Sequence, residues 1–358
     1  MSAAFHTLRV AEVRRETPDA VSVRFDVPEA LANAFKFRSG QHLTVRAEIA
    51  GEEVRRNYSV CVAPHEGELR IAVKEIAGGV FSNWANSRLA VGDALEVMSP
   101  HGTFTWTFEA EAARRYVAFA GGSGVTPIIC LLKSSLAVEP NSRFTLLYGN
   151  RSAAQVMFLE ELAGLKNRYM DRLEVFHFLE DEEEETEIFN GRLDADKVEQ
   201  ILTGLVRAED VDAFFICGPG PMMDAVETAL RGRGTPPDRI LIERFTTGPL
   251  SLAQAAAARK LEEEARGRRM SVILDGRRAR VAFDPEKGSI LESARAAGVP
   301  APFACKGGVC ATCRAKLVSG QVEMKANYAL TPAELEAGYI LTCQAVPVGD
   351  GVVVDYDG

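Results

Sequence analysis

The run Cys305-Lys-Gly-Gly-Val-Cys310-Ala-Thr-Cys313, with a further cysteine in Leu341-Thr-Cys343-Gln, decides what the last part of this chain is. The spacing C-x4-C-x2-C followed by a distant fourth cysteine is typical of a [2Fe–2S] cluster loop. Two irons that share two sulfides need four thiolates, so a tight loop supplies three and a separate strand supplies the fourth. Glycines at 307 and 308 let the backbone bend close to the sulfides. The sequence therefore predicts a cluster held by Cys305, Cys310, Cys313 and Cys343.

Two other uses of these cysteines fit the sequence less well. A four-cysteine zinc site usually shows two C-x2-C pairs, and this chain has only one. Disulfides are uncommon in cytosolic proteins. The remaining thiols, Cys61, Cys130 and Cys217, are an odd number in apolar or glycine-rich settings, which fits a reducing cytoplasm.

The composition sets the broad class of the protein. A length of 358 residues predicts two or three domains, and 47% hydrophobic with 25% charged residues is ordinary for a soluble globular protein. A net charge of −9 argues against a nucleic-acid partner. Residues 1–10 are too polar for a secretory signal, and no apolar run reaches membrane-spanning length, so we expect a cytoplasmic protein without a membrane partner.

The first 110 residues are expected to form a small antiparallel barrel. They consist of short β-type runs punctuated by turn residues, with one helix at Val80–Leu89. The expected strands are Phe5–Arg14, Ala20–Val27, Gln41–Ile49, Arg55–Cys61, Glu68–Glu75 and Ala94–Met98.

Two motifs of this barrel could bind a flat, phosphate-containing ligand. In Arg56-Asn57-Tyr58-Ser59, strand alternation puts Arg56 and Tyr58 on one face, where a cation and a ring could hold a pyrophosphate and stack on a flat ring system. In Gly78-Gly79-Val80-Phe81-Ser82, a helix start offers free amides to a phosphate. Taken alone, an Arg–Tyr pair on a strand is usually ordinary surface, and Gly-Gly before a helix is usually an ordinary turn.

Residues 111–248 alternate strands and helices, which predicts a doubly wound parallel sheet with ligand-binding loops at the carboxyl ends of its strands. The run Gly121-Gly-Ser-Gly-Val-Thr-Pro127 follows the first strand and precedes a helix, although Pro127 departs from the G-x-G-x-x-G pattern. The expected elements are strands Tyr116–Ala120, Phe144–Tyr148, Leu173–Leu179, Ala213–Cys217 and Ile240–Phe245, and helices Ile128–Leu136, Phe158–Tyr169, Asp194–Leu205 and Gly220–Gly232.

The turn after the second of these strands bears on coenzyme choice. An NAD site usually has an acid there for the ribose hydroxyl, whereas an NADP site has a basic residue. Here the strand runs into Gly149-Asn-Arg151-Ser152, so Arg151 could pair with a 2′-phosphate and Ser152 could donate a hydrogen bond. The sequence favours NADPH.

A linker at 249–269 and a third domain at 270–358 complete the chain. The linker is rich in Ala, Glu, Arg and Lys and is expected to be partly helical, with Glu262/Arg266 and Glu264/Arg268 pairs. The third domain begins with a hairpin around Asp275-Gly276, followed by a helix at 289–297 and the cysteine loop. The acidic run 180–187 is interpreted as a solvated loop rather than a docking patch.

These motifs together resemble the ferredoxin–NADP⁺ reductase superfamily followed by a plant-type ferredoxin of β-grasp fold. The order flavin, nucleotide, ferredoxin is that of oxygenase reductases. More narrowly, Tyr148-Gly-Asn-Arg-Ser152, Met157-Phe-Leu-Glu-Glu-Leu162 and Asn190-Gly-Arg-Leu-Asp194 resemble the reductases of phenylacetyl-CoA epoxidases. The resemblance implies a multidomain fold, with an FAD-binding barrel, an NADP-binding α/β domain and a [2Fe–2S] domain.

The resemblance also implies roles for individual residues. FAD would be held by Arg56, Tyr58 and Ser59 on the strand, with Val73 and Lys74 flanking it and Gly79, Val80 and Ser82 at its diphosphate. The nicotinamide nucleotide would be cradled by Gly122, Gly124, Thr126 and Pro127, with Cys217, Gly218 and Pro219 beside the nicotinamide. Glu243 and Phe245 would reach the flavin from the end of the last strand, and Tyr58, Ser59 and Cys217 would also lie at the reacting atoms.

The implied function is electron transfer from NADPH through FAD and the cluster to a partner oxygenase, expected to be a di-iron enzyme. Reductases of steroid, alkane or aromatic hydroxylases share much of the pattern, and a zinc-binding adaptor is the alternative outside the enzymes. A self-sufficient oxygenase is disfavoured, because the five histidines are scattered and form no Glu-x-x-His, Rieske or facial-triad motif.

Overall fold

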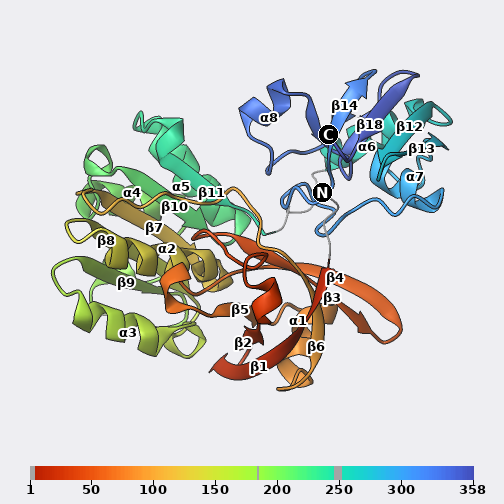
Figure 1. Ribbon diagram of the computed structural model, residues 1–358. Helices are drawn as coiled ribbons and strands as arrows, with labels where there is room; N and C mark the ends of the chain where they lie inside the picture. Colours follow the sequence, from red (N-terminus) through yellow and green to blue (C-terminus); the bar gives the residue numbers. More distant parts are fainter. Residues whose placement is uncertain (1–4, 184, 246–251) are drawn as a thin grey trace. The chain divides into compact units, whose positions relative to one another are not determined.

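The computed structural model of the protein describes residues 5–183, 185–245 and 252–358, which divide into two units. The larger unit holds residues 6–54 and 58–244 and contains an antiparallel and a parallel sheet (Figure 1). The smaller unit holds Phe5, residues 55–57 and the chain from Phe245 onward, and it contains a mixed sheet.

The antiparallel sheet has the strand order β4-β3-β6-β1-β2-β5. A bridge between Val60 and Ile71 joins the end of the first of these strands to the last, so the sheet closes on itself. Its interior is a core of Val, Leu, Ile and Phe side chains, to which helix α1 adds Phe81 and Ala85. The expected antiparallel barrel is confirmed. Its elements are β1 (Phe5–Thr17), β2 (Ala20–Asp26), β3 (His42–Ile49), β4 (Glu52–Ser59), β5 (Leu69–Lys74), α1 (Val80–Ser87) and β6 (Ala94–Met98).

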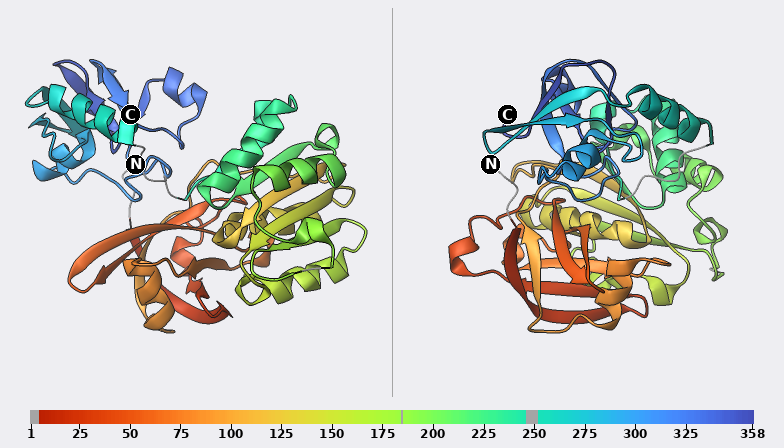
Figure 2. Two further views of the ribbon diagram at one scale, coloured as in Figure 1. Left: turned by 180° about the vertical axis from the view of Figure 1, so that it is seen from behind. Right: turned by 90° about the vertical axis from the view of Figure 1, so that its right-hand side faces the viewer.

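The parallel sheet has the order β11-β10-β7-β8-β9, with a helix after each strand except the last. One apolar core lies between the sheet and helices α2 and α3, and a second lies between the sheet and helices α4 and α5. Figure 2 shows helices on both faces of this sheet. The doubly wound fold is therefore confirmed. Its elements are β7 (Arg115–Gly121), α2 (Val125–Val138), β8 (Arg143–Asn150), α3 (Leu159–Arg168), β9 (Leu173–Leu179), α4 (Ala195–Gly204), β10 (Ala213–Cys217), α5 (Gly220–Gly232) and β11 (Ile240–Glu243).

Several elements begin or end at other residues than expected, and two of these differences bear on the site. Helix α2 begins at Val125, three residues before Ile128, because proline is tolerated in the first helical turn, where its missing N–H has no partner to lose. Strand β11 ends at Glu243, so Phe245 lies beyond the strand.

A buried carboxylate fixes the segment that connects barrel and parallel sheet. Glu139 is fully buried at the end of α2 and accepts four hydrogen bonds. The hydroxyls of Tyr116 and Ser142 donate at 2.9 and 2.6 Å, the Glu109 amide donates at 3.0 Å, and the Arg114 guanidinium donates at 3.2 Å. Because a buried charge is stable only when it is paired and hydrogen-bonded, the buried Glu139 carboxylate needs these four donors.

We expect Glu139→Ala to lower the free energy of unfolding by about 3 kcal/mol or more, since it removes a buried acceptor that the Tyr116 and Ser142 hydroxyls and the Glu109 amide share. Urea unfolding can be followed by tryptophan fluorescence, because the indole of Trp106 donates to the Tyr116 hydroxyl at 3.1 Å. Glu160→Ala, an exposed position on α3, is the matched control and should change stability by less than about 0.5 kcal/mol. Equal effects of both substitutions would contradict this role of Glu139.

The smaller unit has a five-stranded mixed sheet of order β13-β12-β18-β14-β16 and a two-stranded sheet β15-β17. The predicted hairpin is present: Asp275 and Gly276 both have positive φ, 51° and 69°, as a type I′ turn requires. The expected β-grasp type of sheet is confirmed. The elements are β12 (Arg269–Leu274), β13 (Arg277–Ala282), α7 (Ile290–Ala296), β14 (Arg314–Ser319), β15 (Val322–Met324), α8 (Pro332–Glu336), β16 (Tyr339–Leu341), β17 (Ala345–Pro347) and β18 (Val352–Asp355).

The linker is helical in its second part, as α6 (Leu252–Glu264), and residues 246–251 lie outside the described part of the chain. Its ion pairs differ from the expected ones. Arg266 pairs with Glu263 rather than Glu262, and Glu262 instead pairs with Lys325 at 2.7 Å, so the helix is tied to the body of the smaller unit. Among the helices that the structure describes, none is long and apolar enough to cross a membrane.

Candidate functional site

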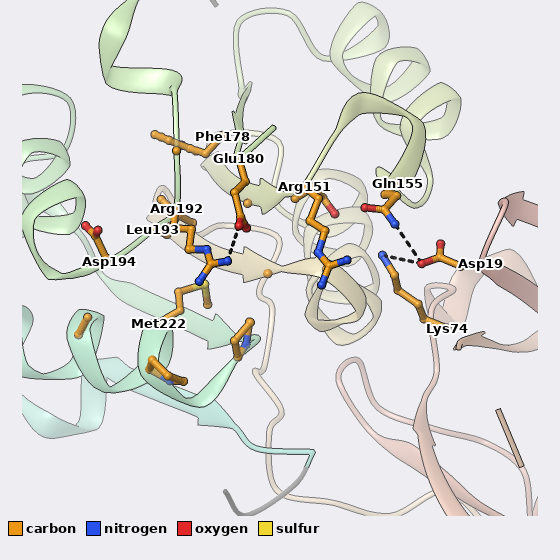
Figure 3. Close-up of a pocket in the computed structure, with 18 of the residues that line it drawn as sticks. Asp19, Lys74, Arg151, Gln155, Phe178, Glu180, Arg192, Leu193, Asp194 and Met222 are labelled. Atoms are coloured by element: carbon orange, nitrogen blue, oxygen red, sulfur yellow. Dashed lines mark hydrogen bonds and ion pairs between the residues drawn. The ribbon is translucent and has the colours of Figure 1, made fainter. Parts of the chain in front are cut away.

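The carboxyl ends of the central parallel strands open into a pocket of about 730 Å³ (Figure 3). Strand β7 contributes Gly121 and β8 contributes Gly149, so no side chain of these two residues fills the space above the sheet. The first turns of α5 contribute Pro221 and Met222 from the other side. A crevice at this edge is where open α/β sheets bind nucleotides.

The glycine loop and the loop after β10 approach each other closely, with glycines on both sides. A Cβ atom on Gly124 would lie 2.1 Å from the Cys217 carbonyl oxygen, and one on Gly121 would lie 2.5 Å from Pro219. Gly218 is equally tight, since a Cβ there would lie 2.9 Å from the Gly121 amide nitrogen. Glycine is therefore required for the approach of the two loops.

This approach brings together the residues predicted to cradle a nucleotide, namely Gly122, Gly124, Thr126, Pro127, Cys217, Gly218 and Pro219. Of these, Gly122 and Pro219 line the pocket itself. Thr126 lies in the first turn of α2 and donates its hydroxyl hydrogen to the Ser123 carbonyl at 3.0 Å. The turn 122–124 also contacts strand β5, so the barrel meets the glycine loop here.

Charged side chains from separate elements line the pocket (Figure 3). Arg151, directly after β8, lies between two ion pairs (Figure 3). On one side Arg192 pairs with Glu180, and the guanidinium of Arg192 lowers the pKa of that carboxyl. On the other side Lys74 lies 3.6 Å from Asp19.

Several of these lining residues carry no role in the sequence prediction. The Gln155 side-chain amide donates to the Asp19 carboxylate at 3.4 Å, and this bond joins the parallel-sheet part to the barrel. Asp194 caps α4, because its carboxylate accepts from the Lys197 amide. Arg192 and Asp194 belong to the run Asn190-Gly-Arg-Leu-Asp194, one of the runs that carry the resemblance to epoxidase reductases. This run could have pointed to the two residues as part of the pocket. Ser152, predicted to bind the coenzyme beside Arg151, is not among the residues that line the pocket.

The barrel residues predicted to hold FAD lie on β4, β5 and the start of α1. Tyr58 is half-buried, with its ring centroid 5.4 Å from that of Phe81, and Arg56 is exposed. Ser59 is buried, and its Oγ has no hydrogen-bond partner in the described residues. A buried hydroxyl without a partner is costly, so this site fits a polar ligand atom. Val73 is fully buried beside Lys74 at the end of β5.

The loop before α1 is closed by its own hydroxyl. The Ser82 Oγ accepts from the Ile76 amide at 3.2 Å and lies 3.4 Å from the Gly79 carbonyl. Gly79 is the N-cap of α1, and Val80 is exposed at its first position. Ser82 therefore shapes the helix start, and the open amides of this turn remain the groups that fit a diphosphate.

Glu243 and Cys217 are neighbours on adjacent strands, opposite each other in the register of β10 and β11. Burial, and after it the Glu243 carboxylate, raises the pKa of the Cys217 thiol well above its ordinary value. Cys217 is therefore a neutral thiol here. Phe245 lies beyond the strand and is 37% exposed.

The four cluster cysteines lie as two pairs in the smaller unit. Cys313 directly precedes β14 and Cys343 closely follows β16, and these two strands pair antiparallel with Arg314 opposite Leu341. The register therefore brings Cys313 and Cys343 together, and their side chains hydrogen-bond. Cys305 and Cys310 form the second pair, within the loop.

The loop is shaped for sulfur. Lys306, Gly308 and Ala311 all have positive φ, and the Gly307 amide donates to the Cys305 sulfur at 3.3 Å. Within each pair the hydrogen bond lowers the pKa of the accepting thiol, Cys310 or Cys343, and raises the pKa of the donating one, Cys305 or Cys313. Amide and thiol donors aimed at sulfur favour thiolates.

Two thiolates for each of two irons is what a [2Fe–2S] cluster needs, so the residues fit that group. Within the described ranges, no set of three or more His, Cys, Asp or Glu side chains is arranged to hold a single metal ion. The arrangement of the four cysteines as two pairs matches the two irons of such a cluster.

Comparison with known families agrees with this division of the chain. Residues 7–106 match the oxidoreductase FAD-binding domain, residues 119–228 match the oxidoreductase NAD-binding domain, and residues 272–348 match the 2Fe-2S iron-sulfur cluster binding domain.

Two relatives are similar over nearly their whole length. The chain is 43% identical over 353 residues to one of the subunits of the 1,2-phenylacetyl-CoA epoxidase of Escherichia coli (strain K12), covering 99% of this chain and 98% of that protein. It is 35% identical over 354 residues to the ferredoxin reductase component of 3-ketosteroid-9-alpha-monooxygenase of Rhodococcus rhodochrous, covering 98% and 96%.

Solved structures share the architecture. A type IV self-sufficient cytochrome P450 monooxygenase matches with a TM-score of 0.70 and 25% identity, over 98% of this chain and 41% of that chain. Phthalate dioxygenase reductase matches with a TM-score of 0.58 and 23% identity over 98% of both chains. The second likeness shows that the fold is shared over nearly the whole length of both chains.

Proposed function

The chain belongs to the family of oxygenase reductases that combine FAD-binding, NAD-binding and [2Fe–2S] domains, and we propose that it passes electrons from NADPH to a di-iron oxygenase that acts on phenylacetyl-CoA. The observation that carries this proposal is the near full-length similarity to a component of an epoxidase, together with a nucleotide pocket and paired cysteines in one chain.

The order of the domains has a chemical reason. NADPH gives two electrons as one hydride, whereas an iron–sulfur cluster accepts one electron at a time. FAD, when bound, accepts a hydride and releases its electrons singly. The protein has to place the nicotinamide, the flavin and the cluster in sequence and to keep the reactive atoms in position.

We assign the flavin to the barrel side of the larger unit. Tyr58 offers a half-buried ring for stacking, Arg56 a cation for the diphosphate, and Ser59 a hydroxyl that no described residue bonds and that a ring atom could use. The Val80 amide at the start of α1 would face the diphosphate, and Gly79, whose own amide donates to the Ile76 carbonyl at 2.8 Å, would let the phosphate approach the backbone closely. Cys217 and Glu243 would approach from the parallel sheet, where the nicotinamide binds.

Coenzyme choice rests on Arg151. Its guanidinium lies in the pocket, and no acid follows β8 directly. Glu180, an acid of the pocket, is paired with Arg192. A guanidinium beside a neutralised acid favours a 2′-phosphate, so we assign NADPH as the preferred coenzyme.

Arg151→Ala should raise KM for NADPH about 10- to 100-fold, because a charge-assisted hydrogen bond is worth about 1.5–3 kcal/mol. KM for NADH should change by less than about twofold, since NADH has no 2′-phosphate. Steady-state ferricyanide reduction with both coenzymes measures this difference.

The matched control is Arg143→Ala, an exposed arginine at the opposite end of the same strand, which should leave both KM values unchanged. An equal loss with both coenzymes in Arg151→Ala, or a wild-type preference for NADH, would remove the assignment.

The partner can be tested by reconstitution. The similarity to a ketosteroid monooxygenase reductase makes a steroid hydroxylase the second candidate partner. The purified chain should support product formation by a phenylacetyl-CoA epoxidase at a rate well above that with a ketosteroid hydroxylase. The reverse order of rates would replace the proposed partner.

We also propose domain boundaries near residues 110, 248 and 269, and a cytoplasmic location. The three thiols that the cluster does not use, Cys61, Cys130 and Cys217, are reduced and buried, which fits a reducing compartment.

A further inference from the structure

A buried histidine of the barrel faces the parallel sheet. His42 begins β3, its side chain is almost fully buried, and its ring meets the His101 ring edge-on with centroids 4.3 Å apart. The absence of a side chain at Gly102 leaves room for the His42 ring, because a Cβ on Gly102 would lie 2.8 Å from the His42 Nδ1 atom. His42 Nε2 is buried and has no hydrogen-bond partner in the described residues. A buried ring nitrogen without a partner calls for an explanation.

The Nδ1 atom of His42 points to a carboxylate. It lies 3.7 Å from the Glu243 Oε1 atom, and both side chains are largely shielded from solvent. Glu243 comes from β11 and His42 from the barrel, so the pair joins the two halves of the larger unit. On the sheet side, Glu243 stands opposite Cys217 in the register, the residue assigned to the nicotinamide.

The charges around His42 favour its neutral form. Burial, and after it the neighbouring His101, lowers the pKa of His42 well below its ordinary value. His101 is itself oriented by the Thr44 hydroxyl and the Ser99 carbonyl. The group of opposite sign is Glu243, and Cys217 behind it is a neutral thiol. A neutral imidazole beside a carboxylate can accept one proton with little net cost, because the resulting pair carries no net charge.

The reaction leaves one proton to place. A hydride consists of one proton and two electrons, so a coenzyme that leaves as NADP⁺ delivers all three. The cluster accepts the two electrons one after the other and no proton. One proton per coenzyme must therefore pass from the buried site to solvent.

We propose that His42 and Glu243 together take up this proton. This inference rests on the proposed function, because it needs hydride transfer within the larger unit. Glu243 receives the proton at its carboxylate, His42 Nδ1 shares it, and the proton then passes to water, which restores the neutral imidazole and the carboxylate. His42 is thus a proton-holding residue that sequence motifs did not single out.

The test separates the proton from the hydride. Holoenzyme variants are mixed with NADPH without air, and flavin bleaching, cluster reduction and proton release to an indicator dye are followed together. His42→Gln should leave hydride transfer within about twofold and slow proton release about 10²-fold, the usual effect of removing a positioned acid–base group. His42→Asn can still direct an amide at Glu243 but cannot carry a proton, so it should be equally slow.

The control is His65→Gln, an exposed histidine of the same barrel, which should behave as wild type. Normal proton release in His42→Asn would show that His42 only positions Glu243, and this would overturn the proposal. A readout independent of turnover is the pKa of His42, measured by NMR in the oxidised protein. Glu243→Gln should lower that pKa, because it removes the carboxylate that favours the imidazolium form.

An unchanged pKa of His42 in Glu243→Gln would also overturn the proposal. Failure of the proposed function looks different, because a wild-type protein whose flavin NADPH does not bleach would have no hydride step at all. That result would remove both the function and this inference.

Discussion

Cys310→Ser is expected to abolish electron transfer to the oxygenase while NADPH still bleaches the flavin. Cys310 is 3% exposed, hydrogen-bonds to Cys305, and lies in a loop where no described residue offers a replacement thiolate. A serine oxygen is a harder and poorer ligand for iron than a thiolate. Since even outer-shell changes cost about 10- to 100-fold in metal affinity, losing a direct ligand should cost more.

The measurement is visible absorption and EPR of the dithionite-reduced protein, together with ferricyanide reduction. Ferricyanide reduction should remain near the wild-type rate, because the larger unit has its own cores. The control is Cys130→Ser. Burial raises the pKa of Cys130 to about 12, and the residue lies inside α2, away from any proposed ligand role. A full [2Fe–2S] signal with normal oxygenase coupling in Cys310→Ser would refute the ligand assignment.

Gly124→Ala should reduce kcat/KM for NADPH about 10²-fold. The new methyl group would lie 2.1 Å from the Cys217 carbonyl oxygen, which is backbone and cannot swing away. The glycine loop and the Cys217–Pro219 segment must then separate. A displacement of about 1 Å at a reacting group can cost 10²-fold in rate. Reduction of the same flavin by dithionite should be normal, because dithionite needs no nucleotide pocket.

Gly220→Ala is the matched control for this substitution. Gly220 lies at the start of α5, shortly after the Cys217–Pro219 segment, and a Cβ there would meet nothing within 4 Å. Its kinetics should remain within about twofold of wild type. If Gly124→Ala were as active with NADPH as Gly220→Ala, the close approach of the two loops would not matter for coenzyme binding.

The strands and helices of the parallel sheet were the most predictable part of the fold. Strands β9 and β10 and helix α5 have the expected ends, because buried parallel strands are continuous apolar runs and Pro219-Gly220 marks the start of a helix. The predicted start of α2 was wrong by three residues. Glycines and a proline are typical of a loop, but the amides of a first helical turn have no acceptor within the helix, so Pro127 loses no hydrogen bond there.

The candidate site was predictable only where its residues are close in sequence. Spacing predicted the cysteines, but their pairing follows from the register of β14 and β16. The contacts of Arg192 with Glu180 and of His42 with Glu243 join separate elements. Local sequence patterns carry no information on such distant contacts. The predicted ion pair of Glu262 with Arg266 was wrong for the same reason, because Glu262 pairs with Lys325, which is distant in sequence.

The most direct test of the account is an anaerobic titration of the purified holoprotein with NADPH, followed by absorption and EPR spectroscopy. The account predicts that flavin absorption falls first and that the signal of a reduced [2Fe–2S] cluster then appears. Addition of the oxidised oxygenase should make that signal disappear. A protein that contains zinc instead of iron, or a cluster that dithionite reduces and NADPH does not, would contradict the path from coenzyme through flavin to cluster.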